Sequence, residues 1–227
     1  MFLVLAYKYD WSVIPGSIGI LLDGLRYSVL LSLVAAACAV ILGMLVSLLR
    51  TAPLAPVRWL AFVYTQVFRA MSPYIYILWI YFGVAIATGL NLSPFAAGVA
   101  SLTFLYSAYM SEVFRSSLAA VDRGQREAAY SLGLSRPAAF AVVILPQAYR
   151  IALPSLISLV VILFKDSSLV ATIGAPDLMN ATIQRVTVLN HSFELYTFTA
   201  LLYIVVTTVF LRLAAILEQH LRRHLAV

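Results

Sequence analysis

The longest polar interruption of an otherwise apolar chain is DRGQREAAYSLGLSRPAAFAVVILP, residues 122–146. It lies between two hydrophobic segments that are each long enough to cross a bilayer. The stretch predicts two short helices that meet at Gly133, and Ser135 is a residue type that often caps the start of a helix. Small side chains at Ala128 and Ala129 would allow another surface to approach closely. We interpret the stretch as a short, charged helix pair that docks a partner at one face of a membrane.

The composition is that of a membrane protein. The chain has 227 residues, of which 63% are hydrophobic and 11% are charged, and its mean hydropathy is +0.98. Soluble domains are roughly 45–50% apolar and about 25% charged. The net charge of +6 would suit a nucleic-acid-binding protein. However, the arginines gather at the ends of apolar segments, which membrane topology explains better. We therefore expect lipid contacts and no nucleic-acid partner.

Five apolar segments predict five membrane spans, at about 20 residues for each span. The second segment contains Arg69 and Pro73, so we expect it to begin shallow in the membrane or to break where protein and water can satisfy it. Residues 1–22 are expected to form a short segment outside, without a removable signal peptide. A second polar segment separates the last two spans. The predicted spans are residues 24–49, 59–87, 95–113, 151–173 and 195–217.

The basic residues predict the orientation of the chain. Three of them, Lys8, Arg26 and Arg185, fall on one side of the predicted spans. A much larger group falls on the other side: Arg50, Arg58, Arg69, Arg115, Arg123, Arg126, Arg136, Arg150, Arg212, Arg222 and Arg223. Because basic residues concentrate in cytoplasmic loops, we expect the N-terminus outside. The docking stretch and the C-terminus then lie in the cytoplasm.

Residue patterns for enzyme chemistry are absent from the sequence. There is no phosphate-binding G-x-x-x-x-G-K-[ST] segment, and neither lysine lies among glycines. The three histidines, His191, His220 and His224, have no cysteine or carboxylate at metal-site spacing. The single cysteine, Cys38, permits no disulfide within the chain. We expect no catalytic activity and no metal or cofactor in this chain.

The docking stretch resembles a known motif. Gly124-Gln125, Glu127-Ala128-Ala129, Gly133 and Ile144-Leu145-Pro146 resemble the EAA loop of the permease subunits of bacterial ABC importers. The surrounding sequence, over about residues 22–218, resembles the polar amino acid uptake branch. The resemblance implies an all-α integral membrane protein with the type I importer permease fold. It implies five transmembrane helices, N-out and C-in, in one permease domain, residues 1–227, with a cytoplasmic coupling loop at about 118–150 between the third and fourth helices.

The resemblance also implies partners and roles. A cytoplasmic dimer of ABC ATPase subunits would bind ATP and Mg, and a second permease subunit, identical or homologous, would complete the pathway. A periplasmic binding protein would deliver a polar amino acid or an amino-acid-like solute, and the chain would lie in the bacterial inner membrane. By this resemblance, the residues that couple the chain to the ATPase are Glu127, Ala128, Ala129, Gly133, Leu145 and Pro146.

Six residues are candidates for the translocation path: Arg69, Tyr74, Tyr76, Ser158, Lys165 and Asp166. The adjacent charges Lys165 and Asp166 either line a cavity and contact an amino-acid zwitterion, or form a structural pair. In the second case Lys165 extends outward and Asp166 bonds the hydroxyl of the neighbouring Ser167 or Ser168. Arg69 is either an anchor at the membrane face or a gate. Tyr74 and Tyr76 are two apart on a helix, so only one can face a cavity.

Two further patterns bear on this path. Glu112 and Arg115 are spaced for an ion pair on one helix face. The chain departs from the family pattern at residues 70–72, where Gly-Thr-Pro is usual, at Tyr76, where glutamine is usual, and at Ser158, where asparagine is usual. These positions approach the path, so the resemblance leaves the solute open.

Two other classes of function remain possible at this point. One is a secondary transporter or channel driven by an ion gradient, which inverted repeats and broken helices would indicate. The sequence contains neither a repeat nor a series of buried acids. The other is a membrane scaffold that transports nothing and uses its docking loop to recruit a cytoplasmic protein.

Overall fold

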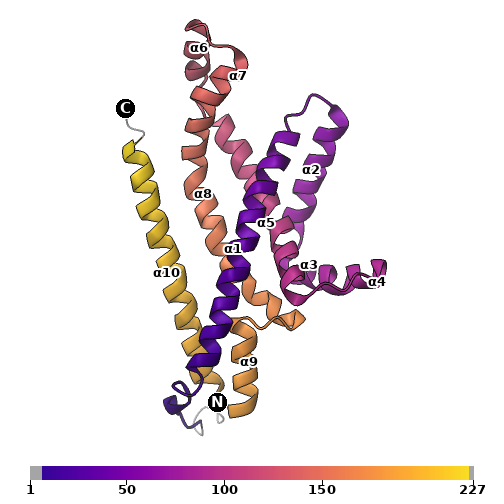
Figure 1. The fold of residues 1–227 in the computed structure, drawn as a ribbon, viewed down its shortest axis with the longest axis vertical. Coiled ribbons are helices and arrows are strands. Elements are labelled where there is room, and N and C mark those ends of the chain that lie inside the picture. The colour runs from indigo at the N-terminus through magenta and orange to yellow at the C-terminus, as the bar shows by residue number, and fades with distance from the viewer. Residues whose placement is uncertain (1–6, 225–227) are drawn as a thin grey trace.

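The computed structural model describes residues 7–224, with their side chains as far as residue 216. Every regular element in that part of the chain is a helix. Long helices run side by side, the helices α6 and α7 form one tip of the molecule, and the described start of the chain lies at the opposite end (Figure 1). The side chains of His220, Arg222, Arg223 and His224 lie outside the described side chains.

Helices α1 (Ile18–Leu49) and α5 (Pro94–Ala119) form the centre of the fold. Small residues let them approach closely: a Cβ atom at Gly43 would lie only 2.9 Å from the backbone oxygen of Ser107 in α5. The core between the long helices contains fully buried side chains from both, among them Leu31 and Leu102. Such small-residue contacts are typical of helices packed in membranes, where apolar side chains gain little by leaving lipid. Helix α5 also contacts α2, α3 and α8.

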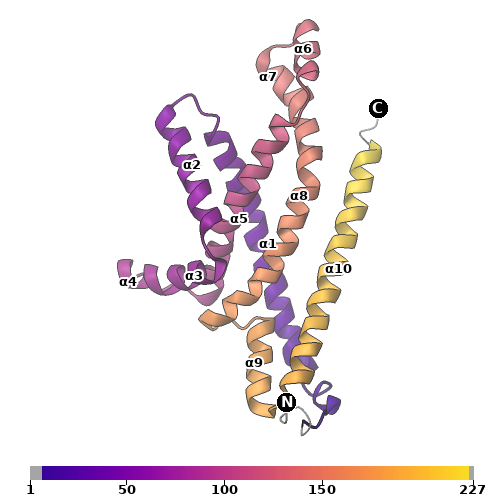
Figure 2. The same ribbon diagram turned by 180° about the vertical axis from the view of Figure 1, so that it is seen from behind.

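The predicted second span, residues 59–87, is broken. Helix α2 (Ala55–Ala70) and helix α3 (Pro73–Leu78) meet at a bend of 108°. Proline has no N–H for the helix ladder, and Met71 and Ser72 take extended conformations before it. Of the two possibilities for this segment, the structure shows the break. Helix α3 continues through a π-helical turn η3 (Trp79–Gly83) into α4 (Val84–Thr88), and this arm extends away from the long helices (Figure 2).

The helix that contains the predicted fourth span begins earlier than that span. Helix α6 (Arg123–Ser131) is separate, but α7 (Arg136–Ala139) runs through a π-helical turn η4 (Phe140–Ile144) into α8 (Leu145–Asp166) and the 3₁₀ helix η5 (Ser167–Ile173). Proline at residue 146 does not interrupt the helix. This helix thus begins 15 residues before the predicted span, and the second half of the predicted loop is part of one long apolar helix, residues 136–173.

The polar segment between the last two spans contains a helix that sequence patterns did not reveal, α9 (Leu178–Leu189). Its start packs against α1, where a Cβ atom at Gly24 would lie 2.9 Å from the Cα of Leu178. Helix α10 (Ser192–His224) follows and is longer at both ends than the predicted span.

Three of the described helices are long and apolar enough to cross a membrane: residues 18–49, 136–173 and 192–216. The bent pair α2 and α3–α4 counts as a fourth if it forms one span. Helix α5 has 26 residues, but its serine, threonine and tyrosine residues make it less apolar. The count of five spans and the orientation stay predictions. The docking helices and the C-terminal end of α10 share one end of the molecule, as the basic residues predict (Figure 1).

Candidate functional site

The docking helix α6 is fixed at both ends by local hydrogen bonds. At its start, Oδ1 of Asp122 accepts the backbone N–H of Gly124 at 2.7 Å, which is an N-terminal cap. At its end, the N–H of Leu134 donates to the carbonyl of Ala129 at 3.1 Å and that of Gly133 donates to the carbonyl of Tyr130 at 3.0 Å. This pair of bonds is the Schellman motif, and Gly133 adopts the left-handed φ of 80° that it requires. The predicted break at Gly133 is confirmed.

The two faces of α6 differ in what they contact. Glu127 and Ala128 are exposed, whereas Ala129 is only 3% exposed and packs against its own chain. Arg126 also faces inward, where its Nη2 donates to the carbonyl of Leu118 at 2.9 Å. Only one of the two alanines expected to meet another surface is therefore available. Beyond the helix, Leu132 is 82% exposed and adds an apolar side chain to the free end.

The remaining predicted coupling residues lie at the base of this tip. Ser135 precedes α7, and its carbonyl accepts the N–H of Ala139 at 2.8 Å, but its hydroxyl makes no capping bond. Leu145 is 46% exposed at the start of α8, and Pro146 is half-buried beside it. A side-chain hydrogen bond of 3.2 Å from Gln147 to Gln125 joins α8 to α6. The tip is thereby tied to the long helix.

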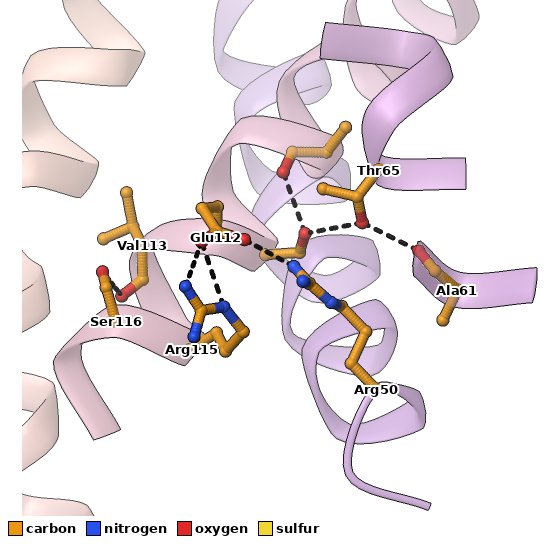
Figure 3. A network of polar contacts seen from close by, with 9 residues as sticks. Arg50, Ala61, Thr65, Glu112, Val113, Arg115 and Ser116 are labelled. Carbon is orange, nitrogen blue, oxygen red and sulfur yellow. Dashed lines mark hydrogen bonds and ion pairs between the residues drawn. The ribbon is translucent and has the colours of Figure 1, made fainter. Parts of the chain in front are cut away.

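An ion network holds the same end of α1 and α5 together (Figure 3). Glu112 pairs with Arg115 on its own helix, as predicted, and also with Arg50 at the end of α1. The Arg50–Glu112 contact of 2.5 Å crosses between the helices. Nearby, Thr65 of α2 donates to the carbonyl of Ala61 at 2.8 Å and lies 3.4 Å from the hydroxyl of Ser111. Sequence reasoning treated Arg50 only as a topological charge, because its partner is distant in the chain.

Asp166 faces a cavity of about 250 Å³ near the bend between α2 and α3. The hydroxyl of Tyr106 donates to its Oδ2 at 2.7 Å. In the alternative of a structural pair, Asp166 is expected to accept from Ser167 or Ser168. Its hydroxyl donor is Tyr106 instead, and the hydroxyl of Ser167 donates to the carbonyl of Phe164. Lys165 is exposed, since consecutive helical residues point in different directions. The cavity is lined by Pro73, Leu105, Tyr106, Tyr109, Leu159, Ile162 and Asp166.

Arg69 does not line this cavity, but it contacts Tyr109, which does. Its guanidinium carbon lies 5.8 Å from the ring centre of Tyr109, within the range of a cation–π contact. The hydroxyl of Tyr109 donates to the backbone carbonyl of Arg69 at 3.1 Å. The ring of Tyr109 is 6.0 Å from that of Tyr106. A series of neighbouring side chains thus connects a guanidinium at the end of α2 to the carboxylate of Asp166 in α8.

The other candidates for the path are placed differently. Tyr76 is 3% exposed and packs edge-on against the ring of Phe68 at 5.2 Å, while Tyr74 is 46% exposed. The expectation that the two point different ways is confirmed, but neither lines the cavity at Asp166. Ser158 is exposed and donates to the carbonyl of Pro154 at 3.0 Å. Sequence reasoning did not single out Tyr106 and Tyr109 as site residues.

Comparisons with known proteins relate the whole chain to a family. Residues 39–223 match the family described as "Binding-protein-dependent transport system inner membrane component". The chain is 33% identical over 178 residues to the glutamate/aspartate import permease protein GltK of Escherichia coli O6:H1, covering 75% of this chain and 80% of that protein. It is 30% identical to the arginine transport system permease protein ArtQ of Bacillus subtilis (strain 168), covering 94% and 97%.

A solved structure shares the whole fold. It is described as "Crystal structure of an amino acid ABC transporter with histidines", and the match has a TM-score of 0.90 at 31% identity. It covers 94% of this chain and 100% of the matched chain. Because the family match spans well over half of its residues, this chain belongs to the family of binding-protein-dependent transport system inner membrane components.

Proposed function

We propose that this chain is the membrane-spanning subunit of an ATP-driven importer that moves a polar amino acid, or an amino-acid-like solute, from a periplasmic binding protein into the cytoplasm. The chain is a multi-pass protein of the inner membrane. Its relatives are named as import permeases for glutamate and aspartate and for arginine. Family membership favours this function over an ion-driven transporter and over a scaffold that transports nothing.

One observation carries the choice of solute class. The carboxylate of Asp166 and the guanidinium of Arg69 lie at the two ends of the Tyr106–Tyr109 series. An amino-acid solute carries an ammonium group, which the carboxylate of Asp166 complements. Two aromatic rings separate Arg69 from Asp166, so a single amino acid does not contact both. Ionisable groups inside a membrane protein are costly unless they serve a cavity or a partner. We place the solute path past this cavity, with Asp166 as the group that receives the ammonium.

The tip of the molecule supports the proposed contact with an ATPase subunit. The exposed face of α6, with Glu127 and Ala128, seats in the ATPase subunit, while Ala129 and Gly133 keep the helix packed and terminated. Leu145 and Pro146 transmit the contact into α8. A dimer of ATPase subunits binds ATP and Mg, and this chain forms one permease domain that pairs with a second permease subunit, identical or homologous. The coupling loop spans about residues 118–150.

Co-purification tests the assembly, and ATP hydrolysis tests the solute. The complex of this chain with its ATPase, in lipid nanodiscs with the binding protein, should hydrolyse ATP faster when its solute is added. A panel of acidic, basic and neutral polar amino acids would identify that solute. Asp166→Asn should remove most of the stimulation, while Ser158→Ala, on the same helix outside the cavity, should keep it. Failure to recruit any ATPase, or full stimulation of the Asp166→Asn complex, would contradict the proposal.

A further inference from the structure

Two adjoining cavities lie at the end of α1 beneath the docking helices, with volumes of about 310 and 340 Å³. Both are lined by Ser47, Leu48, Leu118 and Phe140, so they form one groove, which we call the tip groove. One part of the groove is apolar and is completed by side chains of α1, α5 and α8, including Met44 and Phe114. The tip groove is separate from the cavity at Asp166, with which it shares no lining residue.

The other part of the tip groove is basic. Arg126 from α6 and Arg136 from α7 line it, together with the phenol of Tyr130 and the hydroxyl of Thr51. No carboxylate is among the lining residues of either cavity. The Nη2 of Arg126 donates to the carbonyl of Leu118, but the Nε of the same side chain is buried without a hydrogen-bond partner. Because buried N–H groups are nearly always paired, this nitrogen calls for an acceptor that the chain does not supply.

The position of the groove adds a second constraint. Its apolar part runs along the last turns of α1, and that helix is followed by Arg50, the first charged residue after a long apolar run. The basic part continues beyond the end of that helix, toward α6 and α7. A ligand that fills the tip groove must therefore be apolar at the level of the spans and anionic at the level of the tip.

We propose that the tip groove binds an anionic phospholipid. The phosphate lies between the guanidinium groups of Arg126 and Arg136, and the upper part of an acyl chain fills the apolar part. Basic pockets between transmembrane helices suit such headgroups. A zwitterionic headgroup fits less well, because its ammonium finds no carboxylate in the lining. Free phosphate would leave the apolar part of the groove empty.

Native mass spectrometry of the full-length chain in detergent, titrated with phosphatidylglycerol, tests the site. The double variant Arg126→Gln/Arg136→Gln should weaken binding about 30-fold, given the usual contribution of two basic residues near a headgroup. The matched control is Arg123→Gln/Arg150→Gln, which removes the same charge from two exposed positions that line neither cavity. The control should bind as the unchanged protein does. Equal losses in both double variants would reduce the effect to diffuse charge and overturn the proposal.

Two further ligands distinguish the contribution of the headgroup to binding from that of the acyl chains. Phosphatidylethanolamine should bind at least several-fold more weakly than phosphatidylglycerol, and glycerophosphoglycerol, which lacks acyl chains, should not bind measurably. Equal binding of either one would overturn the assignment.

Replacing Arg126 also removes its hydrogen bond to the carbonyl of Leu118, which could disturb the fold. Two single variants that keep Arg126 therefore test the site independently. Arg136→Gln alone should weaken binding without loss of helix content. Leu48→Trp fills the junction of the two cavities without changing charge, and it should also weaken binding. Undiminished binding by both single variants would overturn the proposal.

Discussion

The two ends of the docking helix α6 are fixed by contacts between near neighbours in the chain, whereas the cavity at Asp166 is assembled from residues far apart. The cap at Asp122 and the bonds at Gly133 each join residues two to five positions apart. At the cavity, Tyr106 and Asp166 are 60 positions apart, and Tyr109 and Arg69 are 40 apart. The docking surface can therefore keep its shape while the long helices move. The cavity must change whenever α2, α5 and α8 shift against one another.

The largest expected effect comes from the docking surface. Glu127→Lys reverses the charge of an exposed residue on the outer face of α6, and it should reduce solute-stimulated ATP hydrolysis of the assembled complex to the basal rate. Glu127→Gln keeps the size of the side chain and removes the charge, so the two variants separate repulsion from lost attraction. The measurement is ATPase activity in nanodiscs with binding protein and solute. Unchanged stimulation in the Glu127→Lys complex would remove α6 from the coupling path.

The next effect is at the cavity. Tyr106→Phe removes the hydrogen bond to the carboxylate of Asp166, and a bond to a charged group contributes about 1.5–3 kcal/mol. We expect solute uptake by proteoliposomes to fall at least about tenfold. Tyr74→Phe is the matched control, because it removes the same hydroxyl from an exposed residue that does not line the cavity. Equal losses in the two variants would show that Asp166 does not depend on Tyr106.

Asp177 makes local contacts, as the ends of α6 do, and is also buried by distant parts of the chain, as the cavity at Asp166 is. It caps α9 locally, with Oδ1 accepting the N–H of Asn180 at 3.0 Å, but burial against distant parts of the chain raises its pKa from 3.8 to about 6. Because the folded chain then holds the proton more tightly, stability from this group is full below about pH 4 and is lost as the pH rises through about 6. Thermal unfolding of the unchanged protein and of Asp177→Asn should differ in pH dependence over that range, on the order of 2 kcal/mol. Parallel pH profiles would contradict this.

The smallest expected effect tests whether the local hydrogen bonds at Gly133 hold the end of α6. Gly133→Ala places a Cβ atom on a residue with a φ of 80° and should destabilise the tip by about 1 kcal/mol. Gly19→Ala is the control, since that glycine lies in α1 with open space around it and should be neutral or slightly stabilising. Hydrogen exchange of the α6 amides measures the difference. Equal protection in the two variants would mean that long-range packing, rather than the turn, holds α6.

The same distinction explains what the sequence could predict. The break at Gly133 and the ion pair of Glu112 with Arg115 depend on residues at most a few positions apart, and both are confirmed. The proline at position 73 indicated a possible break in the second span, but the angle of 108° between the two helices is known only from the structure. Tyr106 and Arg50 acquire their partners only when α5 packs against α8 and α1, so no local pattern announces them.

The continuous helix from Arg136 to Asp166 has a mechanical consequence. At about 1.5 Å of rise per residue, it is a rod about 45 Å long that begins at the docking tip and ends at the carboxylate in the cavity. An axial push at one end reaches the other without passing through a loop. The rod has two places that can yield, the π-helical turn at residues 140–144 and Pro154, because both interrupt the regular hydrogen-bond ladder. The stiffness of the helix at those two places determines how much of an axial movement at the docking tip is transmitted to Asp166.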